Sequence, residues 1–268
     1  MPDDFRPEEN EAMEYLQSLR LEVKPVPRGK SRTAEFLVDG DGRGYAVEVK
    51  AREDSEEWNA AMNAGVVASQ SRSMGSGTWA EEVVRKKALK QLAAVDPEHR
   101  RWWMVWLAVQ ARAARESMER QVFGSLFGVR QVIFWSEGQD PTTRDCLFAE
   151  PGVFERHPEI VAAMVQPAPG KLALALNDFA PDLADFKSSV VYRDMLGKGA
   201  VCDSEGLCVQ PGFVRVTDFQ IDRRSGAAVI AHLTEMYGRG PAYVVDMQEH
   251  TAAIRVPPQP KGAPGGES

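Results

Sequence analysis

Residues 32–52 read RTAEFLVDGDGRGYAVEVKAR, and this stretch decides how the rest of the chain is interpreted. Residues 34–38 and 45–50 have the composition of two short strands. The DGDG segment between them favours a tight turn, because Asp-Gly steps accept backbones with positive φ. In the second strand Glu48 and Lys50 alternate onto one face, and Glu35 on the first strand can face the same side.

Two carboxylates and a lysine that converge on one sheet face indicate a particular chemistry. Carboxylates a few ångströms apart repel each other unless a cation joins them. Oxygen ligands in a loosely built site suit Mg²⁺ or Mn²⁺, and a neighbouring lysine can orient a water molecule or stabilise charge on a phosphate. The arrangement favours cleavage of phosphodiester bonds, and a surface hairpin carrying ordinary exposed charges is the alternative.

The same hairpin resembles a known group of enzymes. Glu35, twelve further residues and the sequence EVK at 48–50 are similar to the motif of the PD-(D/E)XK nuclease superfamily, which has the restriction-endonuclease-like fold. The resemblance covers roughly residues 5–137. It departs at one position, because Ala34-Glu35 stands where the superfamily usually has Pro-Asp.

The resemblance implies a metal-dependent endo- or exonuclease. Glu35 and Glu48 would be the ligands of Mg²⁺ or Mn²⁺, and Lys50 would position or activate the attacking water. DNA is the expected substrate in preference to RNA, which stays open.

The flanking helices are expected to add supporting residues. Residues 8–19 form an amphipathic pattern, in which Glu9 is the expected first-helix carboxylate near the metal. An acidic first turn that merely complements the helix dipole is the alternative. Residues 79–95 predict a second helix, where Lys87 and Gln91 lie one turn apart and would flank the site. A solvated basic face is the alternative there.

Two loops near the hairpin are candidates for contact with substrate. Arg28, Lys30 and Arg32 precede the hairpin and could meet phosphates, or could belong to a solvated turn. The Ser/Gly-rich part of residues 53–78 predicts a mobile loop, either a lid over the site or a disordered insertion.

The order of elements predicts an α/β fold of the restriction-endonuclease-like type, with a mixed sheet flanked by helices and a C-terminal α+β extension. Residues 21–26 read as an edge strand, because Pro25 lacks an N–H. Residues 101–110 and 130–135 read as buried strands. Three tryptophans in the first of these, Trp102, Trp103 and Trp106, are expected in the core rather than as a base-stacking platform.

Three regions are expected along the chain. Residues 1–137 would form a nuclease-like core domain and residues 138–256 an accessory α+β region, with a helix near 158–164 and a strand at 171–176. Residues 257–268 are rich in Pro and Gly and are expected to be a disordered tail.

Composition limits the partners. The 268 residues carry a net charge of −7, so binding to nucleic acid by charge alone is disfavoured. Residues 1–130 hold 20 Lys+Arg and 21 Asp+Glu, a net of −1, and the remainder a net of −6. The few cysteines and the lack of long apolar runs predict a cytoplasmic protein that does not enter a membrane. A homodimer stays open.

Two other function classes stay open as well. One is a weakened or inactive nuclease-fold module that binds nucleic acid or protein, because of the Ala34-Glu35 departure. The other is a structural or assembly protein of a bacterial or phage system. The acidic balance and the less readable second half favour both.

Overall fold

The hairpin forms as strands β2 (Phe36–Asp39) and β3 (Tyr45–Arg52), which pair antiparallel. The glycines of its turn adopt positive φ, a conformation that other residues reach only with strain. At Gly44 a Cβ would lie 2.6 Å from the carbonyl oxygen of Val38. The turn therefore needs glycine both for its backbone angles and for close approach of the two strands.

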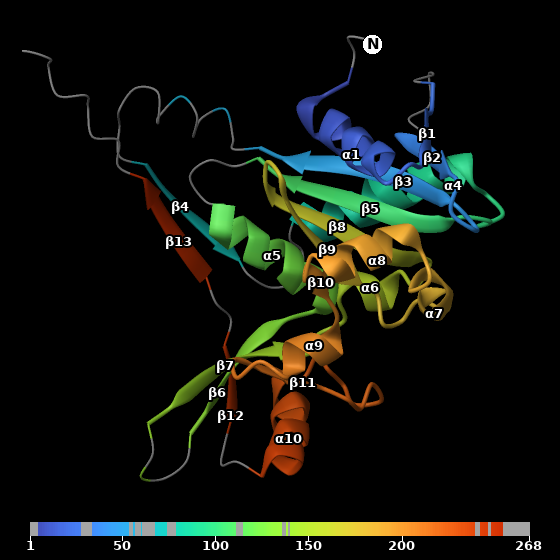
Figure 1. The fold of residues 1–268 in the computed structure, drawn as a ribbon. Coiled ribbons are helices and arrows are strands. Elements are labelled where there is room, and N and C mark those ends of the chain that lie inside the picture. Colours follow the sequence, from blue (N-terminus) through green and yellow to red (C-terminus); the bar gives the residue numbers. More distant parts are fainter. Residues whose placement is uncertain are drawn as a thin grey trace, which may run out of the picture.

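A computed structural model places this hairpin in a mixed α/β fold (Figure 1). It describes residues 5–27, 34–53, 56, 60, 68–73, 79–110, 115–135, 138, 140–238, 242–245 and 248–253.

The largest sheet has seven strands within these described ranges, and it is mixed. β3, β5 and β8 run parallel to one another, whereas β1–β2, β2–β3 and β8–β9 pair antiparallel. β1, which contains Pro25, lies at one edge as expected. The order across the sheet is β1 (Glu22–Pro25), β2, β3, β5 (Trp102–Val109), β8 (Ile160–Ala168), β9 (Lys171–Leu176) and β10 (Val201–Cys202).

Strand β5 is the buried centre that its apolar sequence predicts. Every one of its residues is buried, and Trp102, Trp103 and Trp106 are 2%, 7% and 0% exposed. The Trp106 indole donates to the side-chain oxygen of Gln166 on β8 at 2.8 Å. These rings are core residues, so they offer no stacking surface for bases.

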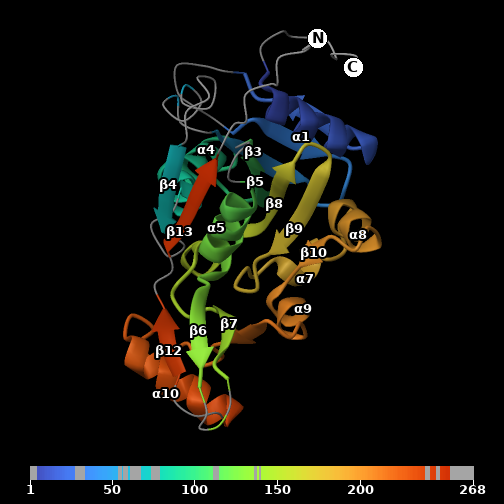
Figure 2. The ribbon, with the colours of Figure 1, turned by 90° about the vertical axis from the view of Figure 1, so that its left-hand side faces the viewer.

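Helices cover both faces of the large sheet (Figure 2). One face, which includes Ala46 and Val105, packs against α3, the π-helical turn η1, α4 and α5. The opposite face, which includes Val47 and Trp106, packs against α1 and α8. The helix bounds are α1 (Pro7–Ser18), α3 (Trp79–Val83), η1 (Val84–Ala88), α4 (Leu89–Val95), α5 (Arg115–Phe127), α6 (Val153–Arg156), α7 (Leu183–Phe186), α8 (Val190–Gly197), α9 (Ser204–Cys208) and α10 (Gly226–Tyr237).

A second sheet lies below the first in Figure 1, together with α10. Among the described residues it has four strands in the order β11, β7, β6, β12. Their bounds are β6 (Arg130–Phe134), β7 (Thr142–Leu147), β11 (Phe213–Arg215) and β12 (Ala242–Val245).

The expected domain boundary at residue 137 does not separate the residues of one sheet from those of the other. β6, expected in the large sheet, belongs to the second sheet and is only partly buried. β8, β9 and β10 come after residue 137 but lie in the large sheet. Val132 and Leu147 of the second sheet share one apolar cluster with Val105 of β5, so the second half of the chain completes the core of the first.

Two further expectations are corrected. Residues 158–164, expected as a helix, belong largely to β8, where all residues are buried; a short apolar run fits a buried strand as well as a helix. Part of the expected mobile loop forms β4 (Ala68–Ser73), which pairs antiparallel with β13 (Gln248–Ala253). This partner lies about 180 residues further along the chain, so local composition carries no sign of it.

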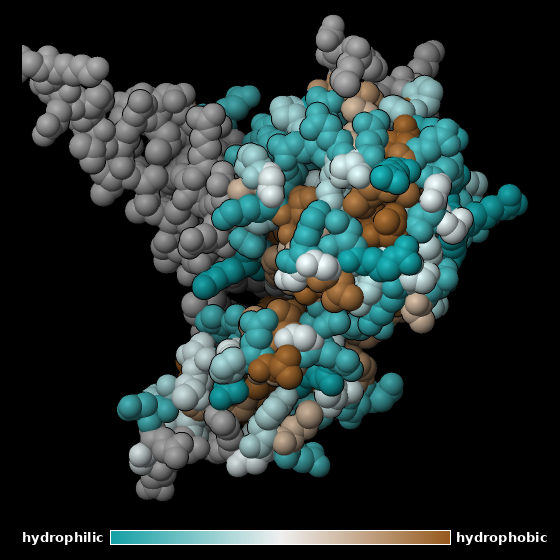
Figure 3. Space-filling model, in the orientation of Figure 1, coloured by the Kyte–Doolittle hydropathy of each residue, from teal (hydrophilic) through white to brown (hydrophobic). Residues whose placement is uncertain are grey.

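The surface seen in Figure 3 is mainly hydrophilic, with apolar side chains in separate small patches. None of the described helices combines the length and the apolar character needed to cross a membrane.

Candidate functional site

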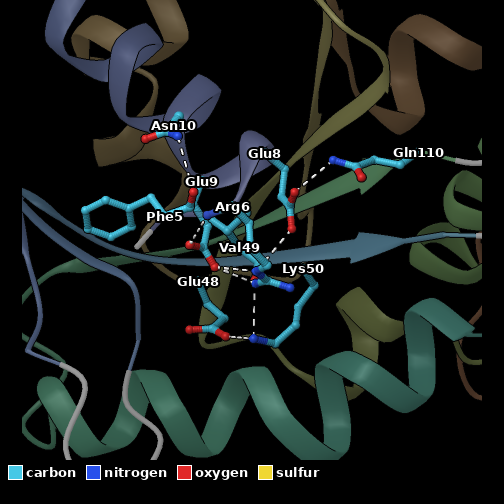
Figure 4. Close-up of polar contacts among 9 residues, drawn as sticks. All are labelled: Phe5, Arg6, Glu8, Glu9, Asn10, Glu48, Val49, Lys50 and Gln110. Carbon is cyan, nitrogen blue, oxygen red and sulfur yellow. Dashed lines mark hydrogen bonds and ion pairs between the residues drawn. The ribbon is translucent and has the colours of Figure 1, made fainter. Parts of the chain in front are cut away.

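Strand β3 directs Glu48 and Lys50 toward the helical layer formed by α3, η1 and α4 (Figure 4). They share the strand face of Ala46, which lies in the apolar cluster on that side. The Glu48 side chain is 0% exposed and that of Lys50 is 14% exposed. The Lys50 ammonium forms an ion pair with Oε1 of Glu48 and donates to the carbonyl of Val49 at 3.2 Å. The predicted neighbours therefore meet, in a buried position rather than on an exposed hairpin.

The other carboxylate oxygen of Glu48 is unusual. Oε2 is buried and has no hydrogen-bond partner among the described residues. A buried charged acceptor without a partner costs at least about 1–3 kcal/mol, and such atoms in folded proteins usually mark a place for a water molecule or an ion. Glu48 thus has one oxygen paired with Lys50 and one buried oxygen without a partner in the described part of the chain.

The electrostatic state of Lys50 follows from its position. Burial lowers the pKa of Lys50 to about 8, and the positive charges of Arg6 and Lys87 act in the same direction. The carboxylates of Glu35 and Glu9 oppose the shift. An amine with this pKa can exchange a proton near neutral pH, as a lysine at its ordinary pKa cannot.

Glu35 lies at the entry to β2, next to the other two predicted residues. Its N–H donates to the carbonyl of Val47 at 3.1 Å, and its own carbonyl accepts from Val26 at 3.0 Å. The β2–β3 register pairs Phe36 with Val47, which brings the backbone of Glu35 beside that of Glu48, and the Glu35 charge raises the pKa of Lys50.

Glu9 lies close enough to Lys50 for its charge to raise the pKa of the lysine. It is 0% exposed. Its Oε2 accepts from the backbone N–H of Arg6 at 3.0 Å, and its Oε1 accepts from Nε of Arg6 at 2.7 Å. Oε2 thus makes the backbone contact of a capping box at the start of α1, and Oε1 is paired with the Arg6 guanidinium.

Three residues of this site were missed from the sequence: Arg6, Glu8 and Gln110. Glu8 is 1% exposed, and its Oε2 accepts from the Gln110 side chain, just after β5, at 2.8 Å. Its Oε1 lies 3.2 Å from Nε of Arg6 as an ion pair without hydrogen-bond geometry. The i, i+4 spacing of Glu8 and Ala12 places Glu8 on the buried face of α1, and this spacing could have indicated its burial from the sequence.

Lys87 and Gln91 do not share a face, contrary to the prediction. Lys87 is exposed and Gln91 is 6% exposed. The cause is the π-helical turn η1, which contains Lys87 and shifts the helical register. Gln91 still contributes through its backbone, because its carbonyl accepts from Ala34 at 3.3 Å. Lys87 acts through its charge on Lys50.

The basic residues predicted to contact phosphates, Arg28, Lys30 and Arg32, lie outside the described residues. No structural statement applies to them.

The donor set fits a hard divalent cation in one specific way. In the described part of the chain, no group of three or more His, Cys, Asp or Glu residues is gathered as a complete metal cage. Mg²⁺ commonly uses only one or two carboxylates and keeps several waters or substrate oxygens. Glu48, whose Oε2 is buried and without a partner in the described part of the chain, and Glu35 are the carboxylates that could hold such an ion.

Comparison with known proteins adds no assignment. No family model, no curated protein and no solved structure matches the chain. Function is therefore inferred from the site itself.

Proposed function

We propose that this protein is a Mg²⁺- or Mn²⁺-dependent nuclease that hydrolyses phosphodiester bonds, with DNA favoured over RNA. The observation that carries the proposal is the state of Glu48. Its carboxylate is fully buried, with one oxygen paired to Lys50 and the other without a partner. Burying such a group is costly, and a divalent ion at Oε2 would offset the cost.

Each residue has a role in this proposal. Glu35 and Glu48 would hold the ion, which when bound lowers the pKa of a coordinated water and offsets negative charge on a phosphate. Lys50, with a pKa of about 8, would hold or transfer a proton at its Nζ near the attacking water. The arrangement of strands supports the proposal, because the β2–β3 hairpin is followed by a helical crossover to the parallel strand β5.

The test combines metal binding with cleavage. Wild type, Glu48→Ala and Lys50→Ala are titrated with Mn²⁺ by calorimetry and assayed on plasmid, single-stranded and branched DNA. Glu48→Ala should lose both metal affinity and activity. Lys50→Ala should bind metal as well or more tightly, because a nearby positive charge opposes a cation, but should lose roughly 10²-fold or more in activity.

Exposed residues of the same types provide matched controls. Glu98 is 65% exposed in its side chain and Lys187 is exposed, so Glu98→Ala and Lys187→Ala should leave both readouts unchanged. If Lys50→Ala cleaves as well as the wild type, the role given to Lys50 is wrong.

A second candidate is a non-catalytic module that binds nucleic acid or protein. The incomplete metal cage in the described residues and the ion pair that already occupies Glu48 Oε1 favour it. A wild type that binds oligonucleotide but neither binds Mn²⁺ nor cleaves any substrate would establish this alternative.

A further inference from the structure

Arg6 reaches the Lys50 site from the N-terminal end of α1. Figure 4 shows its guanidinium beside β3, between α1 and the Lys50 ammonium in that view. Its Nε donates to Oε1 of Glu9 at 2.7 Å, and its Nη2 lies 2.6 Å from the same oxygen. The side chain is 47% exposed, so part of it is open to solvent while Nε and Nη2 are held by Glu9.

The anchoring leaves part of the guanidinium unused. Nη1 has no hydrogen-bond partner within the described residues. A guanidinium offers five N–H donors in a planar fork that matches the oxygens of a phosphate. Because one edge is held by buried carboxylates, the other edge is oriented in advance, which reduces the entropy lost on binding an anion.

The carboxylates that hold Arg6 are themselves held. Glu8 accepts from Gln110 at 2.8 Å, and Glu9 accepts from the backbone N–H of Arg6 at 3.0 Å. Both are almost fully buried. These contacts tie the guanidinium to the end of β5, beside the β3 strand that carries Lys50.

The cations of the site are matched by carboxylates. The charges of Arg6 and Lys87 lower the pKa of Lys50, and those of Glu35 and Glu9 raise it. Binding of an anion here therefore depends on the free donor edge of Arg6 and not on an excess of positive charge.

We infer that Arg6 binds a non-bridging oxygen of the substrate phosphate through its Nη1 edge, with Glu8 and Glu9 as positioning residues. The inference rests on the proposed function and adds the residue that holds the phosphodiester group beside Lys50.

Binding without cleavage provides the test. Fluorescence anisotropy of a fluorescein-labelled single-stranded DNA oligonucleotide is measured in EDTA over a series of salt concentrations. Arg6→Gln should weaken binding by about 10- to 100-fold, the range for a charged hydrogen bond, and should reduce the salt slope by about one. Arg6→Lys should be intermediate, because it keeps the charge but loses the fork. Arg224→Gln, the same charge change at an exposed position, should bind like the wild type.

The outcomes separate this inference from the proposed function. If the wild type cleaves DNA while Arg6→Gln keeps the wild-type Kd, KM and salt slope, the inference fails and the nuclease stands. If the oligonucleotide binds through Arg6 but no metal supports cleavage, the anion site stands and the nuclease fails. Loss of thermal stability in Arg6→Gln with unchanged binding, or no binding by the wild type at low salt, overturns the role of Arg6.

Discussion

The Glu48–Lys50 ion pair can be tested through stability, independently of any activity. Glu48 is 0% exposed and the Lys50 side chain is 14% exposed. Lys50→Met or Glu48→Leu keeps most of the side-chain volume but leaves the other charge buried without its main partner. Such a change costs about 3–5 kcal/mol, a large part of the roughly 5–15 kcal/mol that stabilises a typical domain.

Removing both charges together should cost much less than the sum. A buried pair replaced by apolar groups of similar volume is often close to neutral. Suppose that each single variant loses about 3 kcal/mol of unfolding free energy and that the double variant loses no more than either single one. The coupling energy between Glu48 and Lys50 is then about 3 kcal/mol, which is the upper end for residues in contact.

The assay is urea denaturation at pH 7, followed by tryptophan fluorescence and circular dichroism, with equal m-values required of all four proteins. The pair Glu82–Lys86 is a matched control, because both side chains are more than half exposed and the effects of its two substitutions should be additive. Additive effects at Glu48 and Lys50 would refute the reasoning.

Three further predictions follow from the same contacts and from one turn. The pKa of Lys50 is about 8 in the folded protein and 10.5 for an unperturbed lysine. Between these values the unfolded chain holds more protons, so stability rises with pH there. Relative to the double variant, the wild type should gain about 2 kcal/mol of unfolding free energy from pH 7 to 9.5 in urea titrations. Glu35→Gln should lower the pKa of Lys50 and Lys87→Met should raise it, as measured by NMR of ¹³C-methylated lysines, and shifts in one common direction would contradict the electrostatic account. Gly128→Ala should cost about 3 kcal/mol or more in thermal melts, because a Cβ there meets a backbone oxygen at 1.9 Å, whereas Gly170→Ala, with open space, should cost about 1 kcal/mol.

The local sequence pattern was sufficient to predict the strands around the site. The alternation in residues 45–50 and the Asp-Gly turn predicted the hairpin, and it is present as β2 and β3. The continuous apolar run at 101–110 predicted a buried strand, and β5 is buried throughout. These features are readable because side-chain period and turn chemistry are properties of consecutive residues.

The sequence pattern did not predict to which sheet each strand belongs. β6 and β8 are both short apolar runs, yet one joins the second sheet and the other lies next to β5. Periodicity reports that a face is buried, but it does not report which strand or helix buries it. The pairing of β4 with β13 depends on a partner far along the chain.

The site shows the same division. The sequence alone determined that Glu48 and Lys50 share a strand face and that Glu35 lies near them, because a strand places every second side chain on one side. Only the tertiary structure decided that Glu48 is fully buried, that the pKa of Lys50 falls to about 8, and that Glu9 is paired with Arg6 beside the lysine. The site residues are buried and paired because α1 and η1 pack against the hairpin. No local pattern in residues 32–52 specifies which helices pack against that hairpin.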